Sequence, residues 1–181
     1  MAKTYKAALT TATRSSPGGS GNILTSGCGC IQDGNLWRGV IWIKCGVDPG
    51  RYKIGVAFVE GERLLFSAIV PKSAEKVLLQ SLKEREWKLL VPWMKEGDFK
   101  FIEGRTLEKI CLGNGTSSKE LTGLLSGICE LEITDEYGTT LRGRELYWKL
   151  HPPKGLWKLV PTSLRNPPRD IDDLAAWAII K

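Results

Sequence analysis

The sequence has few of the residues that bind soft metals or form covalent cross-links. It has one histidine, His151, and five cysteines, at positions 28, 30, 45, 111 and 129. The odd cysteine count and the lack of paired CxxC motifs argue against a disulfide framework and against a zinc site. We interpret Cys28 and Cys30 as thiols of a flexible leader. We interpret His151, which precedes two prolines, as a structural residue rather than a general base.

Long apolar runs are also missing. No uninterrupted apolar segment approaches the roughly 18 residues of a membrane span, and the first thirty residues lack the apolar core of a secretory signal. We therefore expect a cytoplasmic protein with no membrane contact. The chain has 181 residues, 42% of them hydrophobic and 25% charged, which is typical of one globular domain with a sizeable core.

The first 36 residues are rich in Ser, Thr and Gly and have no sustained period of a helix or strand. They predict a disordered leader before a domain spanning 37–181. We also hypothesise that the leader is an extension of the gene model and that the product begins near Val40. Lys3, Lys6, Arg14 and Asp33 give the leader a net charge of +2, so +4 of the total of +6 belongs to the domain. This excess modestly favours polyanionic partners.

The rest of the chain is regular. Residues 39–47 predict a buried strand that ends at Asp48, and 53–60 and 63–70 predict two strands joined by the turn Gly61-Glu62. Further strands are expected at 109–113 and 130–134, and helices at 74–90, 119–128, 140–150 and 170–180. An antiparallel meander followed by strands alternating with helices predicts an α/β fold.

Acidic residues stand at three ends of these elements: Asp48, then Asp135 and Glu136, then Asp170, Asp172 and Asp173. The first two groups could converge at the carboxyl edge of a sheet if their strands are neighbours. Asp170 and Asp173 are three apart and would share one helical face.

Clustered acids repel one another unless cations neutralise them, and Mg²⁺ or Mn²⁺ prefers oxygen ligands. Two such ions can support phosphodiester cleavage. Each acid also has an ordinary explanation, as a turn former, a solvated side chain or a partner of the helix dipole.

Four segments in this order resemble a known family. GVDPGRYKIGVAF, ICLGNGTSSKEL, ITDEYGTTLRGRELYW and DIDDLAAWAII are similar to the motifs of RuvC-like resolvases of the YqgF type, in the RNase H-like superfamily. The resemblance spans residues 40–181. It implies a three-layer fold with a mixed five-stranded sheet, three strands antiparallel and the others parallel, and helices on both faces.

The resemblance also implies a two-metal site for Mg²⁺ or Mn²⁺. Asp48 matches the bridging ligand, and Glu136 or Asp135 matches the acid of the fifth strand. At the last position one pattern selects Asp172 and another selects Asp170 with Asp173, of which we favour Asp173. The catalytic set is therefore Asp48, Glu136, Asp172 and Asp173. Asn114 stands where RuvC has a glutamate, which departs from a site of four carboxylates.

Several residues are candidates for contact with nucleic acid. The amides around Gly115 could form an anion nest, with simple helix capping as the alternative. The candidate contacts are Arg51, Lys53, Asn114, Thr116, Ser117, Thr139, Arg142, Arg144 and Arg165. We interpret Trp148, Trp157 and Trp177 as packing residues rather than base-stacking platforms.

The expected function is that of a metal-dependent endonuclease on structured nucleic acid. The resemblance implies branched DNA, as for Holliday junction resolvases in DNA recombination, or precursor 16S ribosomal RNA, as in ribosome biogenesis. A resolvase that cuts two strands symmetrically would be a homodimer. The alternative is a catalytically inactive module that binds nucleic acid or acts as a scaffold. A sugar kinase or actin-like ATPase also begins with an acid and a glycine turn, but needs two such domains and hence a longer chain.

Overall fold

The computed structural model describes residues 41–115, 117–135, 138–161 and 164–180. All of them belong to one compact unit, Arg38–Lys181. The predicted leader and the hypothetical start near Val40 lie outside the described residues.

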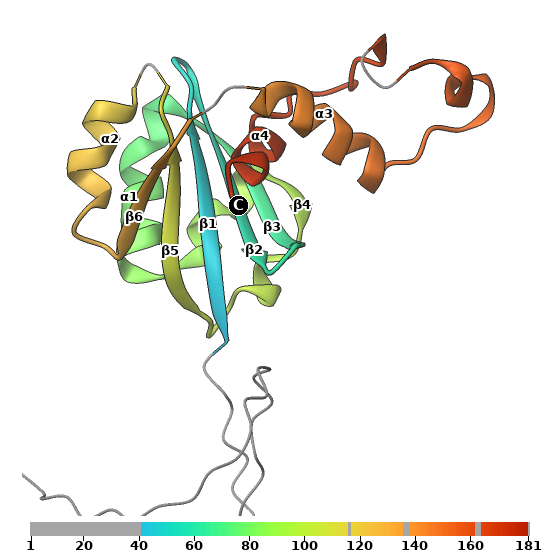
Figure 1. Cartoon of the computed structure of the whole chain (residues 1–181). Helices are drawn as coiled ribbons and strands as arrows, with labels where there is room; N and C mark the ends of the chain where they lie inside the picture. Colours follow the sequence, from blue (N-terminus) through green and yellow to red (C-terminus); the bar gives the residue numbers. More distant parts are fainter. Residues whose placement is uncertain (1–40, 116, 136–137, 162–163, 181) are drawn as a thin grey trace, which may run out of the picture. The chain divides into compact units, whose positions relative to one another are not determined.

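A mixed sheet forms the centre of this unit (Figure 1). Its order is β4-β3-β2-β1-β5-β6, and it comprises β1 (Trp42–Pro49), β2 (Lys53–Glu60), β3 (Arg63–Pro71), β4 (Met94–Gly97), β5 (Thr106–Gly113) and β6 (Glu130–Thr134). The pairs β1–β2, β2–β3 and β3–β4 are antiparallel, whereas β1–β5 and β5–β6 are parallel. The α/β prediction is confirmed in this general form. The RNase H-like assignment is not confirmed, and the count of five strands is wrong because the sheet has six.

The additional strand is β4, a short edge strand of sequence MKEG. It pairs with β3 through Phe66–Gly97, Ser67–Glu96 and Ala68–Met94. Most of its residues are exposed, so it has no buried apolar face that would mark it in the sequence. Its pairing depends on the neighbouring strand rather than on its own pattern.

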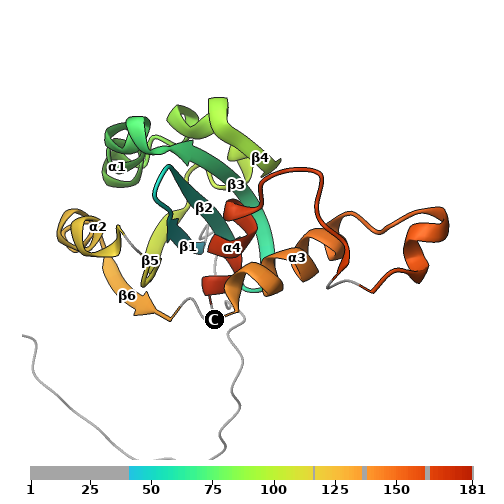
Figure 2. The same ribbon diagram turned by 90° about the horizontal axis from the view of Figure 1, so that it is seen from above.

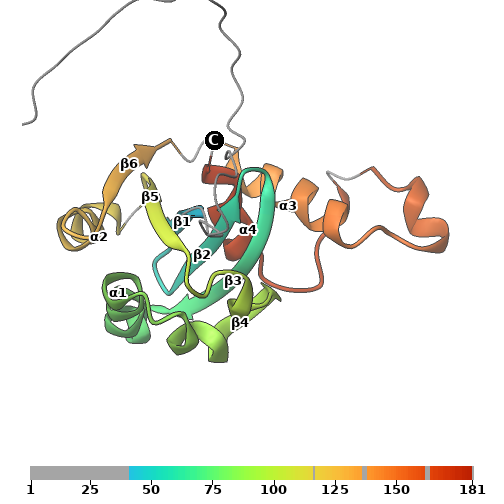
Figure 3. The ribbon, with the colours of Figure 1, turned by 90° about the horizontal axis from the view of Figure 1, so that it is seen from below.

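Helices cover both faces of the sheet. Figures 2 and 3 show α1 (Glu75–Glu84) and α2 (Ser118–Leu125) on one face and α4 (Asp172–Ile179) on the other, with α3 (Thr139–Leu150) beside α4. Short 3₁₀ segments complete the chain: η1 (Lys72–Ala74), η2 (Trp87–Trp93), η3 (Phe99–Phe101) and η4 (Gly155–Leu159).

The helix predicted over 74–90 ends early. Arg85 follows α1 in the left-handed region, with φ of 58°, and stops the helix there. The chain continues as η2, which buries Trp87 and Leu90. The ring of Trp87 packs edge-on against Phe58 at a centroid distance of 5.0 Å. Trp87 and Leu90, which the helical spacing had assigned to the predicted helix, are therefore buried by η2 instead.

Alternation along β1 separates two faces. Ile43, Cys45 and Val47 belong to the main core cluster, which also contains residues of α1 and α2. The residues between them point to the opposite face, because successive side chains of a strand alternate. Asp48 therefore projects toward the face that carries α4.

Glycines let α4 approach the sheet with its backbone. A Cβ added at Gly46 would lie 2.0 Å from the carbonyl oxygen of Ala176, and one added at Gly55 would lie 2.0 Å from that of Asp172. Gly55 is also the cross-strand partner of Asp48. This close approach places the first turn of α4 next to the end of β1.

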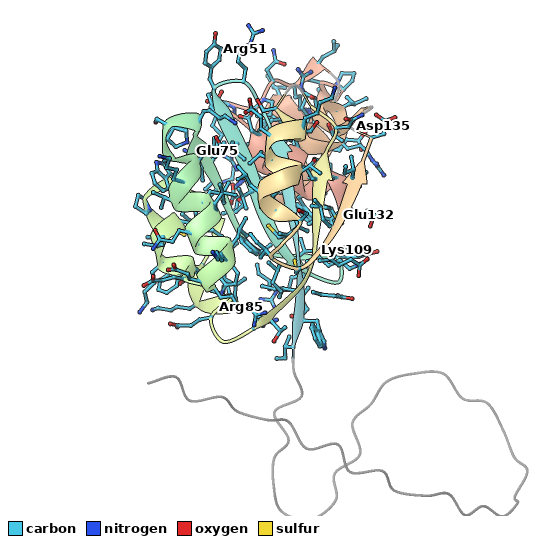
Figure 4. All side chains as sticks on the ribbon, turned by 90° about the vertical axis from the view of Figure 1, so that its left-hand side faces the viewer. Arg51, Glu75, Arg85, Lys109, Glu132 and Asp135 are labelled. Atoms are coloured by element: carbon cyan, nitrogen blue, oxygen red, sulfur yellow. The ribbon has the colours of Figure 1, made fainter. Side chains whose placement is uncertain are left out.

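The other edge of the sheet is β6. Lys109 on β5 lies 2.8 Å from Glu130 and 3.2 Å from Glu132, two residues of that edge strand. Figure 4 shows Lys109 and Glu132 on this side of the molecule, with Asp135 nearer the end of the sheet that carries Arg51. In the described part of the chain, no helix is long and apolar enough to cross a membrane.

We expect Gly55→Ala to lower the free energy of unfolding by about 3 kcal/mol or more, because the methyl group would overlap the backbone of α4. Urea denaturation followed by circular dichroism measures the change. Gly123→Ala is the matched control, since the added Cβ meets nothing within 4 Å in the helix α2. It should raise stability by about 0.5–1 kcal/mol. Equal stability of Gly55→Ala and the wild type would contradict this account of the packing.

Candidate functional site

A cleft of about 340 Å³ opens at the end of β1, between that strand, α3 and the segment leading into α4. Its charged lining consists of three acids and two arginines: Asp48, Asp170, Asp172, Arg144 and Arg169. Thr140, Asn166, Pro167, Ile171 and Ala175 complete the lining. The fold therefore brings the acid of the first strand together with acids of the last helical segment.

Asp48 and Asp172 come from segments more than a hundred residues apart. Asp48 is the penultimate residue of β1, and Asp172 is the first residue of α4. Both are partly exposed. Their proximity follows from Gly55, which pairs with Asp48 and leaves room for the backbone of Asp172.

Asp170 precedes α4 and is largely solvated. Its carboxylate forms an ion pair with Lys53 at the start of β2, and its side chain is 63% exposed. The hydrogen bond from Lys53 lowers the pKa of Asp170, and the same bond raises the pKa of Lys53. The pair joins β2 to the segment before α4 across the mouth of the cleft.

Asp173 has a different environment. Its side chain is fully buried, accepts a hydrogen bond of 2.6 Å from the hydroxyl of Ser67 and lies 2.8 Å from Nη1 of Arg169. The expectation that Asp170 and Asp173 share one helical face is wrong, because α4 begins only at Asp172. Both oxygens of Asp173 thus have protein partners, and the carboxylate anchors α4 to β3.

Arg169 connects this anchor to the edge of the sheet. Its Nη2 atom donates a 2.6 Å hydrogen bond to Oε1 of Glu96 on β4, and its guanidinium lies 5.5 Å from the ring centre of Tyr147. Nε2 of His151 lies 2.8 Å from the same Glu96 oxygen. His151 is therefore held by this hydrogen bond and by a ring contact with Tyr147.

The pKa of Glu96 lies below its ordinary value. Burial alone would raise this pKa, but the hydrogen bonds with His151 and Arg169 together outweigh burial. Glu96 is therefore held in its charged form, which keeps the β4 edge attached to the segments before α4 and after α3.

Of the remaining acids, Asp135 directly follows β6. β5 separates β1 from β6, so Asp48 and Asp135 follow strands that are not neighbours. The two strands are about 9–10 Å apart, twice the spacing of adjacent strands. Asn114 lies between them, and its N–H donates a 3.0 Å hydrogen bond to the carbonyl of Thr134. Glu136 lies outside the described residues.

The predicted nucleic-acid contacts fall in several places. Arg144 lines the cleft, whereas Arg142 lines a separate cavity with Glu62 and Trp177. Arg51 is exposed in the turn after β1, and Ser117 and Thr139 lie at the starts of α2 and α3.

Arg165 is 9% exposed, and its Nε donates to the carbonyl of Val160. Thr116 and the side chain of Trp157 lie outside the described residues.

The acids of the cleft are Asp48, Asp170 and Asp172, and carboxylates of this kind can hold a metal ion. Within the described ranges, no group of three or more His, Cys, Asp or Glu side chains is placed to hold a metal ion. A cage built from protein ligands for two metals is thus not formed by these residues. Asp48 and Asp172 still fit one Mg²⁺, because this ion is commonly held by one or two carboxylates, waters and a substrate phosphate.

Two residues of the network were missing from our predicted site. Glu96 lies on the unpredicted strand β4, where the sequence carries no local signal. Arg169 pairs with Asp173 from outside the helix, since α4 begins only at Asp172. The helical spacing rule for ion pairs therefore gave no signal for Arg169.

No protein-family model matches the chain, and no curated protein matches it. Among solved structures, it is similar to the ROK hexokinase from Thermus thermophilus, with 17% sequence identity and a TM-score of 0.34. The match covers 59% of this chain and 36% of the hexokinase. The chain thus spans about a third of that enzyme's length, and nothing of the enzyme's activity is carried over.

These findings correct the family assignment. The resemblance to RuvC-like and YqgF proteins is wrong as an identification, because no protein-family model and no curated protein supports it. The nuclease, Holliday junction and YqgF descriptions are withdrawn with it. The quoted motifs have ordinary structural causes, such as the turn after Asp48 and the burial of Asp173. Short motifs of this kind do not distinguish one α/β family from another.

We expect Arg169→Met to lower the free energy of unfolding by about 3–5 kcal/mol, because Asp173 would stay buried without its cation. Denaturant titration gives the value. Arg51→Met is the control, since Arg51 is exposed, and should change stability by less than about 0.5 kcal/mol. A similar small change in both variants would show that the pair contributes little.

The lowered pKa of Glu96 predicts a dependence of stability on pH. Its contribution is present above the ordinary glutamate pKa of ~4.3 and is lost as the pH falls through the lower pKa of the folded state. We expect Glu96→Gln to be less stable than the wild type at pH 7 and to lose less stability in acid. Denaturant titrations at pH 7 and pH 3 test this, with the exposed Glu62→Gln as control. Parallel losses in the wild type and Glu96→Gln would contradict the prediction.

Proposed function

We propose that this chain binds the phosphate backbone of structured nucleic acid in the cleft at the end of β1, together with one Mg²⁺ or Mn²⁺ ion at Asp48 and Asp172. The observation that carries the proposal is the shared cleft of these two acids with Arg144. The proposal concerns binding, and it does not depend on any family assignment.

The charge of the cleft supports a role for the cation. The three acids and two arginines that line it have a formal sum of −1, so a phosphate alone would be repelled. One divalent ion changes that sum to +1. Arg169 is already engaged by Glu96 and Asp173, which makes the cleft less attractive to an anion than the formal sum indicates.

Arg144 is the side chain best placed for direct contact with phosphate. It lines the cleft from α3, and among the described residues no ion pair of Arg144 is found. A guanidinium matches the geometry of phosphate oxygens with two parallel hydrogen bonds. Thr140, one helical turn earlier in α3, adds a hydroxyl to the same wall.

Structured nucleic acid fits this small mixed-charge site better than a uniform duplex does. Non-specific duplex binding relies on many lysines and arginines spread over several phosphates. Here one arginine and one cation would contact a single phosphate. Stable binding would therefore need further contacts between the protein and other parts of the ligand. Branched DNA and folded RNA both present such phosphates in defined positions.

The main experiment measures fluorescence anisotropy of labelled branched DNA, duplex DNA and a folded RNA in Mg²⁺, in Mn²⁺ and in EDTA. We expect binding of a structured ligand to be at least about tenfold tighter with the divalent ion, equivalent to about 1.4 kcal/mol. Asp48→Asn and Asp172→Asn should each remove this dependence. Glu62→Gln, at the β2–β3 turn, is the control and should keep it. Equal binding in Mg²⁺ and EDTA would overturn the cation site.

Arginine variants test the phosphate contact separately. Arg144→Gln should weaken binding and reduce the slope of log affinity against log salt by about one. Arg142 lies two residues away but lines the cavity with Glu62 and Trp177. Arg142→Gln should therefore leave the slope closer to that of the wild type. The reverse order of effects would place the ligand on the other side of α3.

Hydrolysis of the bound phosphodiester is not part of this proposal. It needs a group that activates water, and Asp170 is engaged by Lys53 in the described structure. The same samples are therefore analysed for cleavage products. Products that depend on Asp48 would extend the function to a phosphodiester hydrolase, whereas binding without products leaves a nucleic-acid-binding module.

A further inference from the structure

A second cavity, of about 390 Å³, lies beside the cleft on the far part of α3. It is lined by Trp148, His151, Pro152, Pro153, Lys154, Asn166 and Pro168. Two aromatic rings and three prolines make most of this lining flat and apolar. Its polar contributions come from the amide of Asn166, the imidazole and one lysine.

The cleft and the second cavity are neighbours, because residues that are adjacent in the sequence line both of them. Asn166 lines both of them, and Pro167 and Pro168, which follow it, line the cleft and the second cavity respectively. A ligand group attached to a phosphate in the cleft can therefore extend past Asn166 into the apolar cavity. Nucleotides have this combination of a charged phosphate next to a flat aromatic base.

The aromatic wall is held in place before any ligand binds. The indole N–H of Trp148 donates a 3.2 Å hydrogen bond to the carbonyl of Arg165, and the guanidinium of Arg165 lies 5.9 Å from its ring centre. Tyr147 packs edge-on against Trp148 at 5.0 Å and also contacts His151 at 4.7 Å. Glu96 fixes the imidazole from the other side. Side chains already ordered in this way lose little entropy on binding.

We infer that this cavity binds an unpaired nucleobase next to the phosphate in the cleft, which makes nucleic acid with an unpaired nucleotide the preferred ligand. This inference rests on the proposed function and specifies its ligand. A base inside a duplex is stacked and paired, so it would have to leave the helix to enter the cavity. Because every base has an aromatic face, the cavity should tolerate different bases. Trp148, which we interpreted from the sequence as a packing residue, would have this role in addition to its contacts with Tyr147 and Arg165.

The experiment compares two fluorescein-labelled duplexes in Mg²⁺ that differ in one bulged position, which carries either a base or an abasic sugar. We expect the full chain to bind the base-bearing duplex about fivefold to a hundredfold more tightly, the range given by stacking on an aromatic side chain. Trp148→Leu should bring the ratio of the two affinities close to one. Trp148→Phe should retain most of the preference.

Trp42→Leu is the matched control, because Trp42 is 53% exposed at the start of β1 and lies outside both hollows. Ultraviolet cross-linking of a bulged 5-iodouridine to the wild type gives a second readout that does not depend on a variant folding. The adduct is expected within residues 148–154, which contribute most of the cavity wall.

The outcomes separate the two proposals. Equal affinity for both duplexes, with a dependence on Mg²⁺ that Asp48→Asn removes, would overturn the base-binding cavity and keep the proposed function. Absence of binding to either duplex would overturn the proposed function as well. A cross-link outside residues 148–154 and 166–168 would also reject the cavity as the base site.

Discussion

The close contact between α4 and the sheet determines how the rest of the site is arranged. Gly46 and Gly55 have no side chains, so the carbonyls of Ala176 and Asp172 lie where a Cβ would otherwise stand. Gly143 in turn lets α3 approach α4 closely, since a Cβ there would be 3.1 Å from the backbone nitrogen of Ala175. Small residues thus set the distances from α4 to the sheet and to α3, and the cleft exists because the start of α4 reaches the end of β1.

Ionic contacts then fix the direction of the segment that enters α4. Asp173 is held by Ser67 from β3, and Arg169 joins this carboxylate to Glu96 on β4. Lys53 holds Asp170 from the start of β2. Buried carboxylates are tolerated only with such partners. Asp173 and Asp170 thus hold the segment that leads into α4, whereas the proposed cation site uses Asp48 and Asp172, which line the same cleft.

The sequence predicted most strands of the sheet, including the buried β2 and the largely exposed β6. The expected strands at 53–60 and 130–134 match β2 and β6 in both limits, because turn residues bound each of them. It did not predict β4, whose pairing comes from β3, or the early end of α1 at Arg85, where burial of Trp87 overrides helical spacing. Among the acids, the sequence identified the group that meets at the cleft. Burial of Asp173 could not be inferred, because it depends on Ser67 and Arg169 from other segments. Motifs also led to a family that the comparisons do not support.

The charged side chains of the edge strand β6 affect whether two copies of the protein can associate through this strand. An edge strand offers unpaired backbone groups that another strand can extend, a common route to self-association. Here Glu130 and Glu132 lie on the edge strand β6, and Lys109 forms an ion pair with each of them. If β6 of a second copy approached β6 of the first, the glutamates of the two strands would lie close together and repel one another. Continuation of the sheet from one molecule into the next is thereby disfavoured on this side.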